Sequence, residues 1–437
     1  MINPRREKFE KIKQSLKEAQ DYLLIGIDVS KDKHNACFMI SAGRILNRKF
    51  VFENTQKGYE FFLKKIHEYK EAIRPEEIIV GLETTGNYMV ALAEFLSKND
   101  IFVVMVSSFI AKRNRDTLDL SWNKNDIKDA WNVTDCMKQG KILYFAYPNN
   151  PFGDMKRLMT IYSRLSRERG ICKIRLQNNV LCMTFPEFTE VYPEVAELVP
   201  MTILERYTLP ENICKVSEEA FMKDVVKNSG PSARKLKMKA IYKLAHESVG
   251  SREENLSLEW ETKFIIQRIK EIRKIQEGLL NQIKDLAKDC ADYERLQTIP
   301  GVGPVLAATI LTEIGDIDNF RSIRQVLKLA GLDLARIQSG QFTGEARISR
   351  RGKPLLRSAV YQAALVAARN DSALRTKFLH MISKHNAGKG QKKKFLMALG
   401  CKILRIAFTL MKNKESYRND YGGSAPSINS ENVALAH

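Results

Sequence analysis

Three short runs of apolar and aromatic residues follow a charged leader helix near the start of the chain, at residues 22–29, 34–40 and 44–53. Polar turns at Ser30–Lys33 and Ser41–Gly43 separate these runs. Strand-length apolar runs divided by short polar turns are typical of neighbouring antiparallel strands. The pattern therefore predicts an antiparallel meander at the beginning of the first domain.

Helical periodicity follows the meander. Asn54-Thr55 offers an N-cap, and apolar side chains from Phe61 to Tyr69 recur at helical spacing. The next predicted elements are a strand at 78–83, a helix at about 88–98, a strand at 101–106 and a polar helix that opens near Lys124. The order βββαβαβα is that of an RNase H-like α/β domain, which we expect over residues 1–150.

Residues 151–290 lack strand patterns and instead carry long helical patterns rich in Arg and Lys. Prolines at positions 186, 193, 200, 210 and 231 divide this stretch into segments. A seam at heptad spacing is formed by Ile265, Ile269, Ile272, Gln276, Leu279, Ile283 and Leu286. The sequence thus predicts an all-α region with a coiled coil. A seam of about three heptads suits packing on the chain's own helices and pairing with a second subunit equally well.

A third region, 291–412, is predicted to be mostly helical. Its sequence Pro-Gly-Val-Gly contains Gly301 and Gly303, the Gly-x-Gly core of a helix-hairpin-helix-like pattern. Backbone N–H groups exposed in such a loop can bind a nucleic-acid phosphate at the start of the next helix. A tight turn without a ligand has the same sequence requirements. Residues 413–437, polar and rich in Ser and Asn, are predicted to be a disordered tail.

The charge of the chain narrows the class of partner. Among 437 residues, 71 are Lys or Arg and 51 are Asp or Glu, so the formal net charge is +20. Such a chain attracts polyanions, most commonly nucleic acid and next an acidic membrane surface. The seven cysteines form no CxxC pair, which disfavours a disulfide framework or a zinc site. We see no signal-peptide core and no bilayer-length apolar stretch, and therefore expect a cytoplasmic protein with no membrane partner.

Four carboxylates occupy positions from which they could converge on a metal. Asp28 lies in the apolar run of the first strand, and Glu83 closes that of the fourth. Strands one and four are neighbours in an RNase H-like sheet. Asp126 and Asp129 are three residues apart on one helix and are expected to share a face. Metal-assisted phosphodiester cleavage uses two divalent ions roughly 3.5–4 Å apart, and Mg²⁺ prefers oxygen ligands.

Each of these acids alone has an ordinary explanation. A strand-end Glu is commonly solvated, and an Asp pair at a helix start commonly caps the helix and complements its dipole. Their combination, in this order of elements, favours a metal site. Other acids nearby are interpreted as solvated, with Asp119 as the substitute if the helix phase differs: Asp32, Asp116, Asp119 and Asp135.

Several sequence blocks resemble those of one family. They are Ile27-Asp-Val-Ser-Lys31, Gly81-Leu-Glu-Thr-Thr-Gly-Asn-Tyr88, Asn125-Asp-Ile-Lys-Asp-Ala130, Arg175-Leu-Gln-Asn-Asn-Val-Leu, Phe185-Pro-Glu, Ile299-Pro-Gly-Val-Gly-Pro, Glu313-Ile-Gly-Asp, Ala330-Gly-Leu, Gln338-Ser-Gly340, Ile348-Ser-Arg-Arg-Gly352 and Leu356-Arg. In combination and order they resemble the DEDD transposases of the insertion-sequence one-ten family, whose nuclease domain resembles the Holliday-junction nuclease RuvC. The resemblance runs from about residue 22 to 370.

The family resemblance implies three roles. Asp28, Glu83, Asp126 and Asp129 would bind Mg²⁺, as a pair of ions. Ser339 would be a nucleophile that works with this tetrad across a subunit boundary, through a phosphoserine-linked DNA intermediate. An RNA encoded by the element (a bridge RNA) would guide the choice of donor and target DNA, which makes the chain a homo-oligomeric, RNA-guided recombinase of insertion sequences.

The assignment of Ser339 as the nucleophile depends on the family resemblance, because an isolated Ser-Gly most often caps a turn. Ser349, in a more basic segment, is the rival candidate for the nucleophile. The sequence departs from the family pattern in a longer stretch at 187–260 and in Lys353-Pro354, where Asn or Asp and a large residue are expected.

Positive charge gathers in two segments that we predict to bind double-stranded DNA or a structured RNA. The residues concerned are Arg157, Arg164, Arg167 and Arg175 in the first, and Arg347, Arg350, Arg351, Lys353 and Arg357 in the second. Two further functions remain open: a site-specific invertase or junction nuclease that uses the same tetrad without a guide, and a nucleic-acid-binding protein without catalytic activity.

Overall fold

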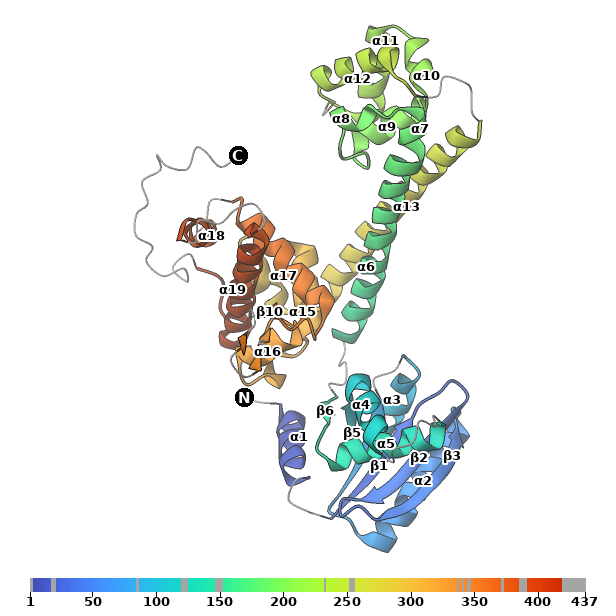
Figure 1. Cartoon of the computed structure of the whole chain (residues 1–437), viewed down its shortest axis with the longest axis vertical. Helices are drawn as coiled ribbons and strands as arrows, with labels where there is room; N and C mark the ends of the chain where they lie inside the picture. Colours follow the sequence, from blue (N-terminus) through green and yellow to red (C-terminus); the bar gives the residue numbers. More distant parts are fainter. Residues whose placement is uncertain are drawn as a thin grey trace. The chain divides into compact units, whose positions relative to one another are not determined.

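The computed structural model describes residues 3–16, 21–83, 86–118, 125–145, 152–231, 233–250, 256–335, 338–339, 342–343, 347–370, 373–384 and 391–418. The chain divides into two compact units (Figure 1), one of residues 1–148 with 316–322 and the other of residues 149–315 with 323–437. Within the described residues, no helix has both the length and the apolar character needed to cross a membrane.

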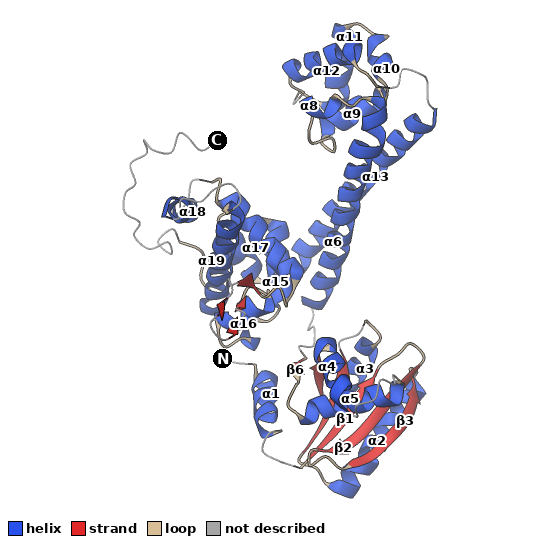
Figure 2. Cartoon of the chain, viewed as in Figure 1, coloured by secondary structure: helices blue, strands red, loops and turns tan. Residues whose placement is uncertain are grey.

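A six-stranded mixed sheet forms the centre of the first unit, in the order β3-β2-β1-β4-β5-β6 (Figure 2). The strands are β1 (Tyr22–Asp28), β2 (Lys33–Ile40), β3 (Ile45–Glu53), β4 (Glu77–Glu83), β5 (Phe102–Val106) and β6 (Leu143–Tyr144). The meander of β1, β2 and β3 is antiparallel, as the sequence predicts. β1 also pairs in parallel with β4, so the strands that end in Asp28 and Glu83 are neighbours. The short β6 was not predicted.

Helices cover both faces of this sheet. They are α1 (Pro4–Ser15), α2 (Gln56–Ile73), α3 (Met89–Lys98), α4 (Ser108–Leu118) and α5 (Asp126–Lys138). On one face, Ile25 packs in a core that includes Phe62 of α2. On the other, Leu24 packs in a core that includes Val133 of α5. Since successive strand residues point to opposite faces, the nearly continuous apolar run of β1 supplies both cores. The sequence did not predict α4.

Two long helices, α6 (Phe152–Arg175) and α13 (Leu256–Leu286), lie side by side in the second unit (Figure 1). All residues of the predicted heptad seam except Leu286 are buried on α13. Gln276 within it accepts a hydrogen bond from Arg169 Nη1 at 3.0 Å and donates one to Ser166 Oγ at 2.7 Å, both on α6. The seam therefore packs on a helix of the same chain, which is one of the two partners that the sequence left open.

Short helices between α6 and α13 pack around a core that includes Phe188, Phe221 and Met238, and both long helices contribute residues to it. In chain order they are the π-helix η1 (Leu176–Leu181), α7 (Cys182–Thr184), α8 (Phe188–Val191), α9 (Leu198–Arg206), α10 (Pro210–Cys214), α11 (Glu218–Ser229) and α12 (Lys235–Glu247). Pro210 is the first residue of α10, a position that tolerates proline because its missing N–H would have no helical partner.

The remaining elements are mostly helical, as predicted. They are α14 (Ala291–Gln297), α15 (Pro304–Ile314), the 3₁₀-helix η2 (Ile317–Asn319), α16 (Ile323–Leu329), β7 (Leu334–Ala335), β8 (Gln338–Ser339), β9 (Phe342–Thr343), β10 (Arg347–Ile348), α17 (Pro354–Ala367), α18 (Ala373–Lys384) and α19 (Lys392–Asn413). Two small sheets, β7 with β10 and β8 with β9, were not predicted. Of the expected tail at 413–437, residues beyond 418 lie outside the described part.

Candidate functional site

β1 and β4 share a short pattern, a glycine two residues before a carboxylate at the strand end. Gly26 and Gly81 are paired directly across the two parallel strands, so Asp28 and Glu83 end these strands at matching positions. Because side chains alternate along a strand, each carboxylate projects from the same face as its glycine. Both glycines face α5. The structure therefore brings Asp28 and Glu83 to one edge of the sheet, on the side that α5 covers.

The two glycines allow the backbone of α5 to lie directly on the sheet. A Cβ atom at Gly26 would come within 2.7 Å of the Ala130 carbonyl oxygen, and one at Gly81 within 2.9 Å of Met137 Cγ. Gly26 N also donates a hydrogen bond to Thr134 Oγ1 at 3.1 Å. Sequence reasoning missed this role, although the repeated glycine-x-acid pattern was its signal.

The start of α5 presents the other two predicted carboxylates. Asn125 caps the helix, its Oδ1 accepting from Lys128 N at 2.7 Å. Asp126 is exposed whereas Asp129 is only 5% exposed, so the two acids differ in surroundings even though they lie one turn apart. Asp129 Oδ1 lies 2.7 Å from Arg115 Nε of α4. Sequence reasoning missed Arg115, and also Lys128, a cation only 3% exposed between the two acids.

The surroundings of these acids bear on whether they suit a divalent cation. Glu83 is 8% exposed, and a buried carboxylate is costly unless a cation or a donor satisfies it. Burial raises the pKa of the nearby Cys136 thiol to about 12, and the charge of Glu83 adds to this. The predicted donors are all oxygen atoms, which fits Mg²⁺ in kind. Among the described residues, however, no three His, Cys, Asp or Glu side chains are close enough together to hold a metal ion.

The alternative acids have other surroundings. Asp135 Oδ2 accepts a hydrogen bond from Asn114 Nδ2 at 2.8 Å, which ties α5 to α4. Asp32 and Asp116 are exposed. Asp119, the predicted substitute, lies outside the described residues. Of the acids that the structure describes, Asp28 and Glu83 are the pair that neighbouring strand ends bring together.

The candidate nucleophiles lie on short strands and turns of the second unit. Ser339 ends β8 and pairs with Phe342 of β9, and its side chain lies outside the described part. Ser349 follows β10, and its Oγ donates a hydrogen bond to Asp333 Oδ1 and accepts one from Arg351 N at 3.3 Å. The Ser349 hydroxyl is thus engaged in closing a turn, with a carboxylate as its acceptor.

The predicted nucleic-acid contacts fall into two groups. The exposed arginines are Arg157, Arg164, Arg167, Arg175, Arg347, Arg350 and Arg351. The other two cations bond within the fold: Lys353 Nζ donates to the Glu313 carbonyl oxygen at 2.6 Å, and Arg357 Nη1 donates to that of Ala330 at 2.9 Å. Burial, followed by the charge of Lys156, lowers the pKa of Lys353 to about 8.

The two glycines of the helix-hairpin-helix-like turn differ in their surroundings. Gly301 has φ +88°, and a Cβ there would lie 2.9 Å from Ala367 N of α17, so this glycine serves close helix packing. Gly303 is the N-cap residue of α15 and is exposed, and a Cβ there would meet nothing within 4 Å. The start of α15 is therefore the accessible part of this turn.

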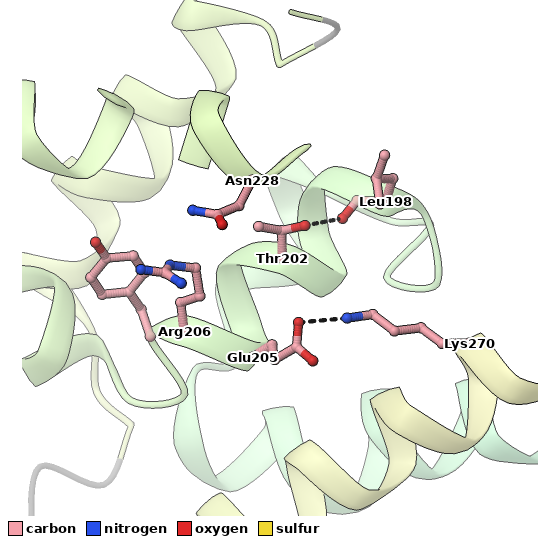
Figure 3. A pocket seen from close by; sticks show the side chains of 7 residues that line it. Leu198, Thr202, Glu205, Arg206, Asn228 and Lys270 are labelled. Carbon is pink, nitrogen blue, oxygen red and sulfur yellow. Dashed lines mark hydrogen bonds and ion pairs between the residues drawn. The ribbon is translucent and has the colours of Figure 1, made fainter. Parts of the chain in front are cut away.

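A pocket of about 560 Å³ lies between α9 and α13 (Figure 3), and its polar side chains already bond to protein partners. Lys270 pairs with Glu205 at 2.6 Å, and Arg206 Nη2 donates to Asp224 at 2.7 Å. Thr202 Oγ1 donates to the Leu198 carbonyl oxygen at 2.9 Å. These contacts account for the pocket as a packing feature among short helices.

Comparison with known families matches two parts of the chain. A model of DEDD transposases of the IS110 type matches residues 25–186, and a model described as the transposase IS116/IS110/IS902 family matches residues 293–379. The first span contains all four predicted metal ligands, and the second contains both candidate serines. Residues 187–292 lie outside both.

Similar curated proteins include transposases and a DNA-inverting protein. A Sinorhizobium fredii protein that carries the transposase name y4rJ is 33% identical over 147 residues, or 32% of this chain. The transposase for insertion sequence element IS1111A of Coxiella burnetii is 29% identical over 140 residues, or 31% of this chain. The pilin gene-inverting protein of Moraxella bovis is 28% identical over 124 residues, or 28% of this chain. The matched part spans 37% of the length of each relative.

Proposed function

The chain belongs to the IS116/IS110/IS902 family of transposases, and from this membership we propose that it is a metal-dependent enzyme that cleaves and rejoins DNA strands during transposition. The observation that carries the proposal is the paired glycine-x-acid pattern of β1 and β4, which places Asp28 and Glu83 at matching strand ends. The first unit would then be an RNase H-like, RuvC-like nuclease domain.

In this proposal Asp28, Glu83, Asp126 and Asp129 hold two Mg²⁺ ions. Bound metal would activate the attacking oxygen and stabilise the leaving one. The chain's own contribution is to fix the carboxylates: neighbouring strands set the spacing of Asp28 and Glu83, and the Asn125 cap fixes the start of α5. The close seating of α5 on Gly26 and Gly81 sets the distance between helix and sheet.

Ser339 is the proposed nucleophile, as the family resemblance implies, acting with the carboxylates of another subunit in a homo-oligomer. A bond forms between Ser339 Oγ and the DNA phosphorus as the bond to the departing strand oxygen breaks; the serine hydroxyl loses a proton and the departing oxygen gains one. The hydroxyl of the new partner strand then bonds to the same phosphorus and loses its proton, while the bond to Ser339 Oγ breaks and the serine is protonated again. Ser349 is the alternative, supported by its hydrogen bond to the Asp333 carboxylate.

We propose double-stranded donor and target DNA and a structured guide RNA as partners. The exposed arginines of α6 and of residues 347–351 support a polyanionic partner, because their positive charge lies at the protein surface. The similarity to a pilin gene-inverting protein supports a second candidate, site-specific DNA inversion with the same carboxylates. RNA that copurifies with the protein and maps to the flank of its element supports the guided transposase; its absence from an active preparation supports the invertase.

The test of the enzymatic proposal separates cleavage from binding. Asp28→Asn should abolish strand cleavage in Mg²⁺ while DNA binding, measured by mobility shift, persists and weakens steeply as salt rises. Asp116→Asn, on an exposed face of α4, is the matched control and should cleave normally. Normal recombination by Asp28→Asn would overturn the tetrad.

A second experiment assigns the nucleophile. Ser339→Ala should remove the covalent protein–DNA adduct that mass spectrometry maps in the parent protein, while Ser349→Ala should retain it. An adduct that persists in Ser339→Ala and maps to Ser349 would reverse the assignment.

A further inference from the structure

The ion pair between Arg115 and Asp129 has unusual geometry for a buried pair. Arg115 Nε and Asp129 Oδ1 are 2.7 Å apart, and the two side chains are 22% and 6% exposed. Both atoms are nevertheless buried without an acceptable hydrogen bond, so the N–H does not point at the oxygen. A charged pair that lacks this alignment is weaker than an aligned or bidentate one. Charge and packing, rather than a well-formed hydrogen bond, hold the arginine against the carboxylate.

The helices that carry the pair are fixed to each other independently of it. Asn114 Nδ2 donates to Asn132 Oδ1 at 3.1 Å, and Asn132 Nδ2 donates to the Ala111 carbonyl oxygen at 2.8 Å. Both bonds are buried and join α4 to α5. Rotation of the Arg115 side chain would therefore release Asp129 without separating the helices.

We infer that Arg115 is a positioning residue that competes with the divalent cation for Asp129. The inference rests on the proposed function, since it takes Asp129 to be a metal ligand. Arg115 supplies the positive charge that a buried Asp129 requires. A cation that binds the same carboxylate must displace the guanidinium, so the arginine lowers metal affinity.

The experiment measures Mn²⁺ binding to the full chain by the loss of the free-ion electron paramagnetic resonance signal. Arg115→Gln should bind Mn²⁺ about tenfold more tightly than the parent protein, because the competitor is gone. Arg113→Gln is the matched control: it lies on the same helix, is exposed, and stacks on Phe109 at 4.5 Å. This control should leave Mn²⁺ affinity unchanged. Arg115→Lys keeps the charge and serves if the glutamine variant does not fold; it should stay within about threefold of the parent.

The outcomes separate this inference from the proposed function. Unchanged or weaker Mn²⁺ binding in Arg115→Gln, with parent binding that Asp28→Asn abolishes, overturns the role of Arg115 alone. Parent binding that is absent, or insensitive to Asp28→Asn and Asp129→Asn, overturns the metal site and this inference with it. If Arg115→Gln binds Mn²⁺ more tightly, and adding Asp129→Asn to this variant removes the gain, the result supports competition between Arg115 and the cation.

Discussion

The carboxylate-bearing α/β domain and the helical segment at 187–292 differ in the surroundings of some of their charged side chains. In the helical segment, charged side chains pair with one another: Glu205 with Lys270 at 2.6 Å, and Arg206 with Asp224 in a two-point contact. In the α/β domain, Glu83 is buried at a strand end, and Asp129 faces an arginine without an aligned hydrogen bond. A family model matches the α/β domain, and none of the family matches extends over the helical segment.

We expect substitutions in the two regions to affect stability and activity differently. Loss of a charge pair in the helical segment should lower the free energy of unfolding and leave strand cleavage unchanged. A buried carboxylate such as Glu83 costs folding energy, so its neutralisation should raise the free energy of unfolding and abolish strand cleavage. Four substitutions test this contrast.

Glu83→Gln is expected to have the largest effect. Strand cleavage should fall by about a hundredfold or more, as when an electrostatic group of an active site is removed. The free energy of unfolding without metal should rise by about 1 kcal/mol, because a buried charge is removed. Glu77→Gln, at the other end of the same strand, should leave cleavage unchanged. A Glu83→Gln protein that is less stable than the parent and cleaves DNA normally would contradict this expectation.

Gly26→Ala should be the most destabilising change. The added methyl group meets the backbone of α5, which cannot move aside as a side chain can, and the expected loss is about 3 kcal/mol of unfolding free energy. Gly81→Ala meets the flexible Met137 side chain and should cost about 1 kcal/mol. Chemical denaturation measures both. Equal losses would show that α5 is not seated as described.

Gln276→Ala tests the helical side of the comparison. Gln276 is 3% exposed and joins Arg169 and Ser166 of α6, so its removal leaves half-buried polar groups without this partner. We expect a loss of about 2 kcal/mol in unfolding free energy and normal Mg²⁺-dependent cleavage below the melting temperature. Gln267→Ala, exposed on the same helix, should change stability by less than about 0.5 kcal/mol. Lost cleavage in a folded Gln276→Ala would extend the site into this region.

Lys353→Met should have the smallest effect, and one that depends on pH. The Lys353 pKa is about 8 in the folded chain, against 10.5 for an ordinary lysine. Between these pH values the unfolded chain binds more protons than the folded chain. Burial of the charged Lys353 therefore lowers the free energy of unfolding by its full amount below pH 8, and this loss shrinks as the pH rises to 10.5. We expect the variant to be about 1–2 kcal/mol more stable than the parent at pH 7, allowing for solvent screening.

Urea unfolding at a series of pH values should show this advantage shrinking as the pH rises above 8. Lys392→Met, at an exposed position, should show no such trend. An advantage of constant size across the series would mean that the charge of Lys353 is not its cause.

The order of the strands could be predicted from the sequence, because apolar runs and polar turns mark them directly. That order, together with the known neighbours in an RNase H-like sheet, placed Asp28 beside Glu83. Arg115 could not be predicted, since α4 itself was missed and its contact with Asp129 depends on how two helices pack. The partner of the Gln276 seam was equally undetermined, because a heptad pattern marks a buried face without identifying what covers it.

The predicted phosphate-binding cations differ in their surroundings. Lys353 and Arg357 belong to a basic segment. A cation that binds a nucleic-acid phosphate and a cation that donates to a carbonyl oxygen within the fold have the same appearance in a sequence. The structure gives both of them carbonyl partners, whereas Arg350 and Arg351 are exposed.

Iron-directed backbone cleavage measures whether the four carboxylates meet at one metal site. Fe²⁺ bound in place of Mg²⁺, with ascorbate and peroxide, cuts the chain next to the metal, and mass spectrometry locates the cuts. We expect cuts around Asp28, around Glu83 and around the start of α5 in the same protein, and we expect all of them to disappear in Asp28→Asn. Cuts confined to one of these places, or cuts at the strand ends that persist in Asp28→Asn, would contradict this expectation.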